Sequence, residues 1–204
     1  MPGHNMRLTN QTLDVRSLGG VFGRCVIDGA GGVVAAGSTG SIFLDELGAS
    51  ATSNVAGGIT NADANLFGGV VPNGEVITIF GWQMQVGEVT SAGLPVDSAA
   101  ELHEAFLDSL SYKIFLKGQE YVQGNLKPVP SGLGCSLLDK NGGANVAPFR
   151  FPGSLPLQIG PNDQLFVQIE AKRAIATGGG TNGIEIFLYC PATRGIAIGQ
   201  LSGA

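Results

Sequence analysis

The sequence predicts an all-β fold: a single jelly-roll β-sandwich of two antiparallel sheets and about eight strands, with one short inserted helix. Short apolar stretches with the alternation of strands recur along the 204 residues, and turn residues separate them. Glycine, at 33 residues, punctuates the chain. The length suits one all-β domain, and the hydrophobic fraction of 44% is enough for a core. We therefore expect one domain over residues 1–204, with a flexible basic segment at about residues 1–20.

Glycine-rich turns divide the first part of the chain into short predicted strands. A loop of small and polar residues is expected over residues 48–63. The strands before it are expected at residues 21–27, 33–36 and 41–47.

The clearest strand signal follows the turn Pro72-Asn-Gly74, which is predicted to join residues 66–71 and 75–89 in a hairpin. The second arm alternates, and this alternation places a set of side chains on one face of a strand. The set comprises Val76, Thr78, Phe80, Trp82, Met84 and Val86.

One helix is predicted over residues 98–110. Ser98 and Glu101 have the spacing of a capping box, in which each side chain bonds the other residue's backbone N–H. Leu102, Phe106 and Leu110 then recur at helical spacing. We expect this apolar stripe to dock the helix onto the sandwich or onto a neighbouring subunit.

Strands are expected again in the second half, around a long loop at residues 131–148 that is rich in Gly, Asn and Pro. A last edge strand is expected at residues 194–201. The other predicted strands are residues 111–117, 120–126, 164–171 and 183–190.

The chain carries little charge for its size, with 11 Lys and Arg and 16 Asp and Glu, or 13% of residues. Soluble domains usually have about 25%. A compact monomer of 20.8 kDa exposes roughly 9,000 Å², or about 330 Å² for each charge. Because interspersed charge keeps domains apart in solution, this surface predicts an assembly protein covered by its neighbours.

The net charge of −5 argues against a chain that coats nucleic acid, and no specific nucleic-acid recognition is expected. The first 24 residues are an exception, because Arg7, Arg16 and Arg24 stand there against the single carboxylate of Asp14. These arginines are either solvated or form an arm that faces an anionic membrane or packaged nucleic acid.

Three widely separated cysteines suit free thiols in a protein made in a cytoplasm. Cys190, which precedes a proline at the end of an apolar strand, is expected to be the most buried. We find no signal-peptide core and no stretch of about 18 apolar residues that would span a membrane.

Signals for catalysis, metals and cofactors are lacking, so we expect no enzyme, no cofactor and no small-molecule substrate. Two histidines, His4 and His103, are too few for a clustered metal centre. Residues 61–65 alternate oxygen donors as a calcium loop does, but lack its glycine, so a turn is the simpler interpretation. A hydrolase would need two acidic side chains paired across a cleft. Glu75 and Glu88 are the most visible acidic residues on the long predicted strand.

Residues 151–170 run through Pro161-Asn-Asp163 into a strand, and residues 112–124 join two strands at a glycine. Both stretches resemble the jelly-roll coat proteins of tailless, icosahedral, membrane-containing viruses of bacteria and archaea. The resemblance implies a capsid subunit, localised in the virion and made in the host cytoplasm. Such a subunit assembles with itself or with a second capsid protein around an inner lipid membrane, towards which the basic N-terminal segment would face.

A carbohydrate-binding or host-attachment β-sandwich module is the alternative. Sugar sites offer exposed aromatic rings beside amides and carboxylates. The aromatic candidates are Trp82, Tyr112, Tyr121 and Tyr189.

Overall fold

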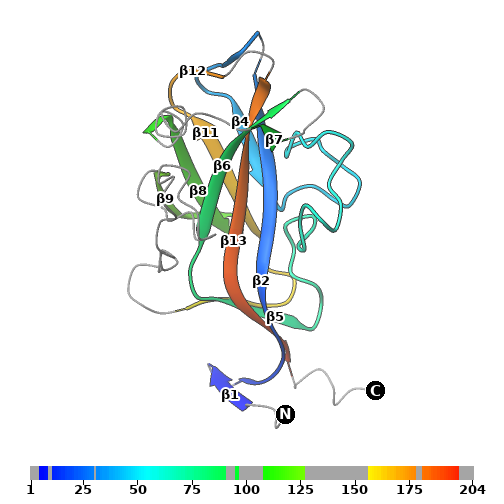
Figure 1. Cartoon of the computed structure of the whole chain (residues 1–204). Coiled ribbons are helices and arrows are strands. Elements are labelled where there is room, and N and C mark those ends of the chain that lie inside the picture. Colours follow the sequence, from blue (N-terminus) through cyan, green and yellow to red (C-terminus); the bar gives the residue numbers. More distant parts are fainter. Residues whose placement is uncertain are drawn as a thin grey trace, which may run out of the picture.

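A computed structural model of the chain shows an all-β, sandwich-like architecture of antiparallel sheets (Figure 1). It describes residues 5–8, 11–29, 31–90, 95–96, 108–126, 156–177 and 181–197. The first sheet contains β1 (Asn5–Leu8), β2 (Gln11–Asp28), β5 (Glu75–Ile79), β6 (Gln83–Thr90), β7 (Pro95–Val96), β10 (Leu157–Ile159) and β13 (Thr181–Ala197). The second contains β4 (Thr39–Ile42), β8 (Leu110–Leu116), β9 (Gln119–Asn125) and β11 (Leu165–Ala171). A small ladder joins β3 (Val33–Val34) to β12 (Ile175–Ala176).

The main strand pairs are nested in the sequence, so that both strands of each pair lie between the two strands of the pair before it, as in one long folded hairpin. The outermost antiparallel pair is β2 with β13, followed inward by β3 with β12, β4 with β11 and β5 with β10. The innermost pair is β8 with β9, which a two-residue turn connects. Lys117 and Gly118 in that turn have φ angles of 54° and 76°, as a tight type I′ hairpin requires.

Two further sets of pairings close the sheets. In the second sheet, β11 also pairs with β8, giving the order β4-β11-β8-β9. In the first, β13 lies between β2 on one side and β5 and β6 on the other, and β6, β13 and β2 run side by side in Figure 1. β13 is therefore the central strand of the first sheet.

Alternating side chains of the two sheets form the main core. β11 alternates strictly between buried and half-buried residues, as its sequence predicted. Gly23 of β2 packs closely on the second sheet, because a Cβ atom there would lie 2.5 Å from Ile42 of β4 and 2.6 Å from the Phe43 ring. Trp82, Ile77 and Ile169 are fully buried between the sheets.

The long strand expected over residues 75–89 is interrupted. Ile79 pairs with Ala192 and Gln83 with Tyr189, so three residues on one strand face two on β13, as in a β-bulge. Pro191 lies at this point of β13, and it has no N–H to donate to the ladder. Because of the extra residue, the alternate side chains before the bulge and those after it point to opposite faces of the sheet. The prediction of one continuous apolar face was therefore wrong.

Phe80 consequently points outward and is 42% exposed, whereas Trp82 is buried. The expected hairpin with residues 66–71 does not form either. Val70 instead makes an isolated bridge with Gln164, because the pairing partner of β5 and β6 is the distant β13.

The chain ends differ from expectation. The predicted edge strand at 194–201 is wrong, because residues 194–197 continue β13 in the interior of the sheet. Residues 5–8 and 11–20, expected as a flexible segment, lie in β1 and β2.

Only the end of the predicted helix falls within the described residues. Asp108 and Ser109 are helical, and Leu110 opens β8 as a fully buried strand residue. The prediction that Leu110 belongs to a helical stripe was therefore wrong. Leu102 and Phe106 lie outside the described residues, as does the predicted loop at 131–148.

Candidate functional surface

The outer face of the first sheet carries three aligned rows of side chains across β6, β13 and β2. Gln83, Tyr189 and Phe22 are directly opposite one another in the first row. They point outward because their neighbours on the same strands are buried between the sheets.

The second row consists of Gln85, Phe187 and Arg24, in the same strand order. We call the six residues of these two rows the aromatic face. The third row is Gly87, Glu185 and Val26.

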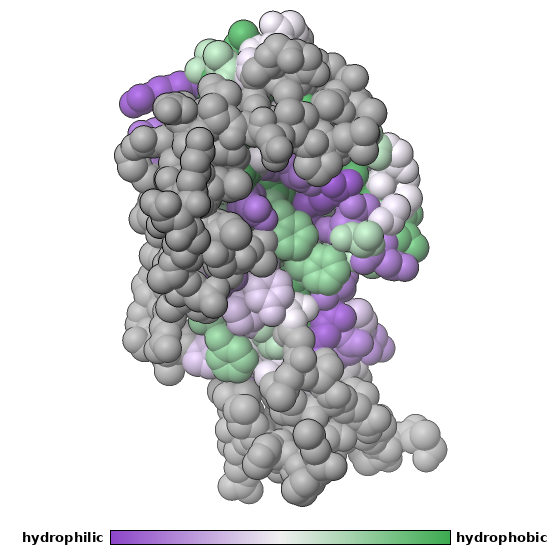
Figure 2. Space-filling model, viewed as in Figure 1, coloured by the Kyte–Doolittle hydropathy of each residue, from purple (hydrophilic) through white to green (hydrophobic). Residues whose placement is uncertain are grey.

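The aromatic rings lie along the sheet. A Cβ atom at Gly20 would overlap the Tyr189 ring, so this ring covers Gly20 and presents its other side outward. The rings of Phe22 and Phe187 are stacked, with centroids 6.1 Å apart and planes 24° apart. Figure 2 shows hydrophobic residues in the middle of this view with hydrophilic residues beside them.

Arg24 forms a compact ion cluster at one end of the aromatic face. Its Nε is 2.7 Å from Asp63 Oδ1 and its Nη1 is 2.6 Å from Glu185 Oε1. All three side chains are less than one quarter exposed. The Arg24 charge is therefore balanced within the chain, whereas the sequence left it either solvated or facing an anionic partner.

The other two N-terminal arginines lie in strands. Arg7 is in β1, opposite Thr12, and Arg16 is in β2. The structure does not bring them together with Arg24 in a described contact.

The amides of the aromatic face are unengaged. Gln83 is only 7% exposed, and Gln85 is half-buried. Within the described part of the chain, neither side chain has a hydrogen-bond partner. A Cβ atom at Gly87, next in line on β6, would have nothing within 4 Å, so the face is open at this position.

The loop over residues 43–74 borders the aromatic face and covers the edge of β2. Asn65 donates from Nδ2 to Gly20 O and accepts from Phe22 N at Oδ1, so it bonds the edge as a strand would. Val26 N donates to Ser53 O. This edge is thereby closed to strand pairing with another chain.

Apolar residues of the same loop pack against the sheet in a second, smaller core. Residues 48–63 were expected only as a loop of small and polar residues. The loop contributes Val55, Ile59 and Ala64, which are buried against Val26 and Val89. These apolar residues are therefore used within the chain.

The oxygen atoms of the calcium-like stretch 61–65 are occupied by the protein. Asp63 Oδ2 accepts hydrogen bonds from Thr60 N at 2.7 Å and Thr60 Oγ1 at 2.6 Å. Its other oxygen contacts Arg24, and Asn65 bonds β2. The stretch therefore forms a side-chain-capped turn, as the simpler interpretation predicted.

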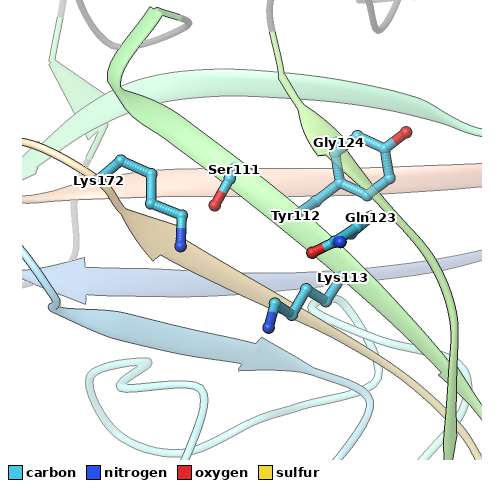
Figure 3. Close-up of a pocket in the computed structure, with 6 residues that line it drawn as sticks. All are labelled: Ser111, Tyr112, Lys113, Gln123, Gly124 and Lys172. Atoms are coloured by element: carbon cyan, nitrogen blue, oxygen red, sulfur yellow. The ribbon is translucent and has the colours of Figure 1, made fainter.

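A shallow cavity of about 180 Å³ lies on the second sheet (Figure 3). Its lining includes Ser111 and Lys113 of β8, Gln123 of β9, and Lys172. Lys113 pairs with Glu120 at 3.4 Å and Lys172 with Glu170 at 2.6 Å. Both charges are balanced, which makes this cavity a weaker candidate for an anionic ligand.

Tyr112 and Gly124 complete the lining of that cavity. Tyr112 is buried, and burial raises the pKa of its phenol. Its ring meets Trp82 edge-on, with centroids 5.9 Å apart. Trp82 and Tyr112 are thus core residues, so neither is an exposed sugar platform. Tyr121 is 48% exposed, and Tyr189 belongs to the aromatic face.

The sequence analysis missed Phe22, Phe187 and the two glutamines of the aromatic face. One signal was available: in residues 82–86, glutamine alternates with Trp, Met and Val, which marks a strand with an amide-bearing outer face. The phenylalanines had no local signal, because they meet only when β2 pairs with β13.

The hydrolase alternative meets a geometric obstacle. Glu75 is opposite Ile196 and Glu88 is opposite Ile184 on the same strand. Twelve residues of strand separate these positions by roughly 40 Å, whereas paired catalytic carboxylates lie within about 10 Å. These two acids therefore do not form a catalytic pair.

The buried cysteines are free thiols. Cys25 is fully buried and Cys190 is 5% exposed, so the prediction that Cys190 is the most buried was wrong. Burial raises the pKa of both thiols, that of Cys190 to about 12. Cys135 lies outside the described residues.

Over the described residues, no group of three His, Cys, Asp or Glu side chains is arranged to hold a metal ion. In the same part of the chain, no helix has the length and apolar character needed to cross a membrane. Comparisons with protein families, curated proteins and solved structures find no match to the chain.

Proposed function

We propose that the chain is a jelly-roll capsid subunit that assembles with copies of itself, or with a second capsid protein, into the capsomers of an icosahedral shell. Its function would then be packing rather than catalysis, and its place would be the virion.

The nested strand order supports the jelly-roll assignment. Apart from the small β3–β12 ladder, successive nested pairs alternate between the two sheets: β2 and β13 in the first, β4 and β11 in the second, β5 and β10 in the first, β8 and β9 in the second. A jelly roll is a double-sheet fold of about eight strands that recurs in viral capsids and in lectins.

The sparse charge is the observation that carries the assembly role. Of the few cations, Arg24, Lys113, Lys117 and Lys172 are neutralised by carboxylates of the same chain. Like charges facing each other across an interface cost several kcal/mol. A surface with few charges, on which these cations are already paired, allows copies of the chain to pack side by side.

Closure of the β2 edge indicates which surfaces remain for neighbours. Strand addition at this edge is blocked by Ser53 and Asn65, so copies would not meet by adding a strand to β2. In a membrane-containing shell, Arg7 and Arg16 would face the lipid headgroups.

Light scattering on the purified protein tests the proposal. We expect oligomers that grow with concentration and persist in 1 M NaCl, because apolar and backbone contacts are little affected as the Debye length falls to about 3 Å. A monomer at every concentration, or oligomers that dissociate in salt, would contradict the proposal.

A further inference from the structure

The aromatic face combines aromatic rings with polar side chains, as a binding site for a polar ligand does. The Tyr189 ring lies over Gly20, and the Phe187 ring stacks beside Phe22. Rows on a strand are two residues apart, so the Tyr189 and Phe187 positions are separated by about 7 Å. The rings thus form a short platform along β13.

Each ring of this platform has an amide beside it. Gln83 is opposite Tyr189 and Gln85 is opposite Phe187. A glutamine amide can donate two hydrogen bonds and accept two. The Gln83 residue is only 7% exposed and its amide has no hydrogen-bond partner among the described residues, but the amide atoms are not among the fully buried unpaired ones. A ligand or water can therefore still reach this amide.

The charge at this face selects for a neutral ligand. Arg24 is already bonded to Asp63 and Glu185, so its charge is not available for an anion. Glu185 adds a carboxylate next to Phe187 on β13, and Gly87 leaves open space opposite it. Carboxylate oxygens accept hydrogen bonds from hydroxyl groups.

A sugar ring has the matching chemistry: its C–H groups pack on the negative face of an aromatic ring, and its hydroxyls donate and accept at the rim. A second copy of the chain packed here through apolar groups would leave the two amides unpaired. We propose that the aromatic face binds a neutral oligosaccharide, with Phe187 and Tyr189 as platforms and Gln83, Gln85 and Glu185 as hydrogen-bonding groups.

Native electrophoresis in gels that contain hydroxyethyl cellulose, laminarin, a mannan or an arabinogalactan tests this. We expect at least one of these neutral polysaccharides to retard the protein, and heparin to have no such effect. Gln85→Ala should weaken the binding about tenfold, since it removes hydrogen bonds to the sugar. Phe187→Ala should weaken it at least as much.

Matched variants on the second sheet serve as controls. Phe166 stacks on Phe115 with centroids 4.5 Å apart, and Gln168 is half-buried beside them on β11. Phe166→Ala and Gln168→Ala should bind as the parent does. If Phe187→Ala melts at a lower temperature than the parent, Gln85→Ala, which alters a group without partners, gives the decisive comparison.

Failure of every polysaccharide to retard the parent would overturn the proposal, as would unchanged binding by Gln85→Ala. Loss of oligomers in Phe187→Ala, without polysaccharide binding by the parent, would likewise overturn it and identify the face as a contact between copies. Polysaccharide binding is measured on protein that has not assembled into oligomers, so this proposal does not rest on the assembly role.

Discussion

Replacing Asp45 by Asn should loosen the loop over residues 43–74, because the Asp45 carboxylate holds two other residues of that loop, Thr52 and Ser53. The Asp45 carboxylate accepts from Thr52 N at 3.0 and 3.1 Å, from Thr52 Oγ1 at 2.9 Å and from Ser53 N at 2.7 Å. An amide loses one acceptor oxygen and turns an N–H donor toward these donors. Because Ser53 is 1% exposed, its N–H would be left buried without a partner.

A hydrogen bond to a charged group contributes about 1.5 to 3 kcal/mol, and an unsatisfied buried group costs about 1 to 3 kcal/mol. We therefore expect Asp45→Asn to lower the free energy of unfolding by about 2 to 4 kcal/mol. Urea unfolding at pH 7 measures this value. Glu46→Gln, an exposed charge change at the next residue, is the control and should leave the midpoint unchanged.

The pH dependence gives a second test of the same contacts. Partial burial acts to raise the pKa of Asp45, but hydrogen bonds from Ser53 and Thr52 outweigh it and lower the pKa below its ordinary value. A lowered pKa contributes stability above the unfolded value of about 3.9, and this contribution is lost as pH falls through the folded pKa. The difference between parent and Asp45→Asn should therefore narrow below about pH 4. Equal urea midpoints at pH 7 would refute the argument.

Three other perturbations follow from the structure. Gly23→Ala should destabilise the protein by about 1 to 3 kcal/mol in thermal unfolding, because the methyl would overlap side chains of the second sheet; Gly87→Ala, with open space around it, should not, and equal losses would contradict this packing. Cys25 and Cys190 should resist iodoacetamide in the native state and react fully in guanidinium, as mass spectrometry would show; native labelling or a linked pair would contradict their burial. Replacing Arg7 and Arg16 by Gln should weaken binding to anionic liposomes roughly thirtyfold at low salt, at about 1 kcal/mol each; unchanged binding by this variant would exclude the membrane-facing segment.

The strands that the sequence predicted well are those whose environment is local. β8 and β11 alternate between buried and half-buried residues along most of their length, and the tight turn at Lys117-Gly118 fixes the register of β9 on β8. Alternation alone was enough here because one face of each strand meets the core and the other meets solvent.

The features that sequence reasoning missed depend on distant partners. The bulge beside Phe80 is set by Pro191, more than one hundred residues away along the chain. The aromatic face exists because the register of β2 on β13 brings Phe22 beside Tyr189. Alternation cannot reveal a partner strand, and that partner determines which aromatic residues gather on one face.

Electron microscopy of the assembled fraction tests the central claim of a capsid subunit most directly. Purified protein at the concentration where scattering rises should show discrete particles with rotational symmetry, each built from jelly-roll-sized units, and these should survive 1 M NaCl. Isolated single subunits, or aggregates without a defined size or symmetry, would contradict the claim.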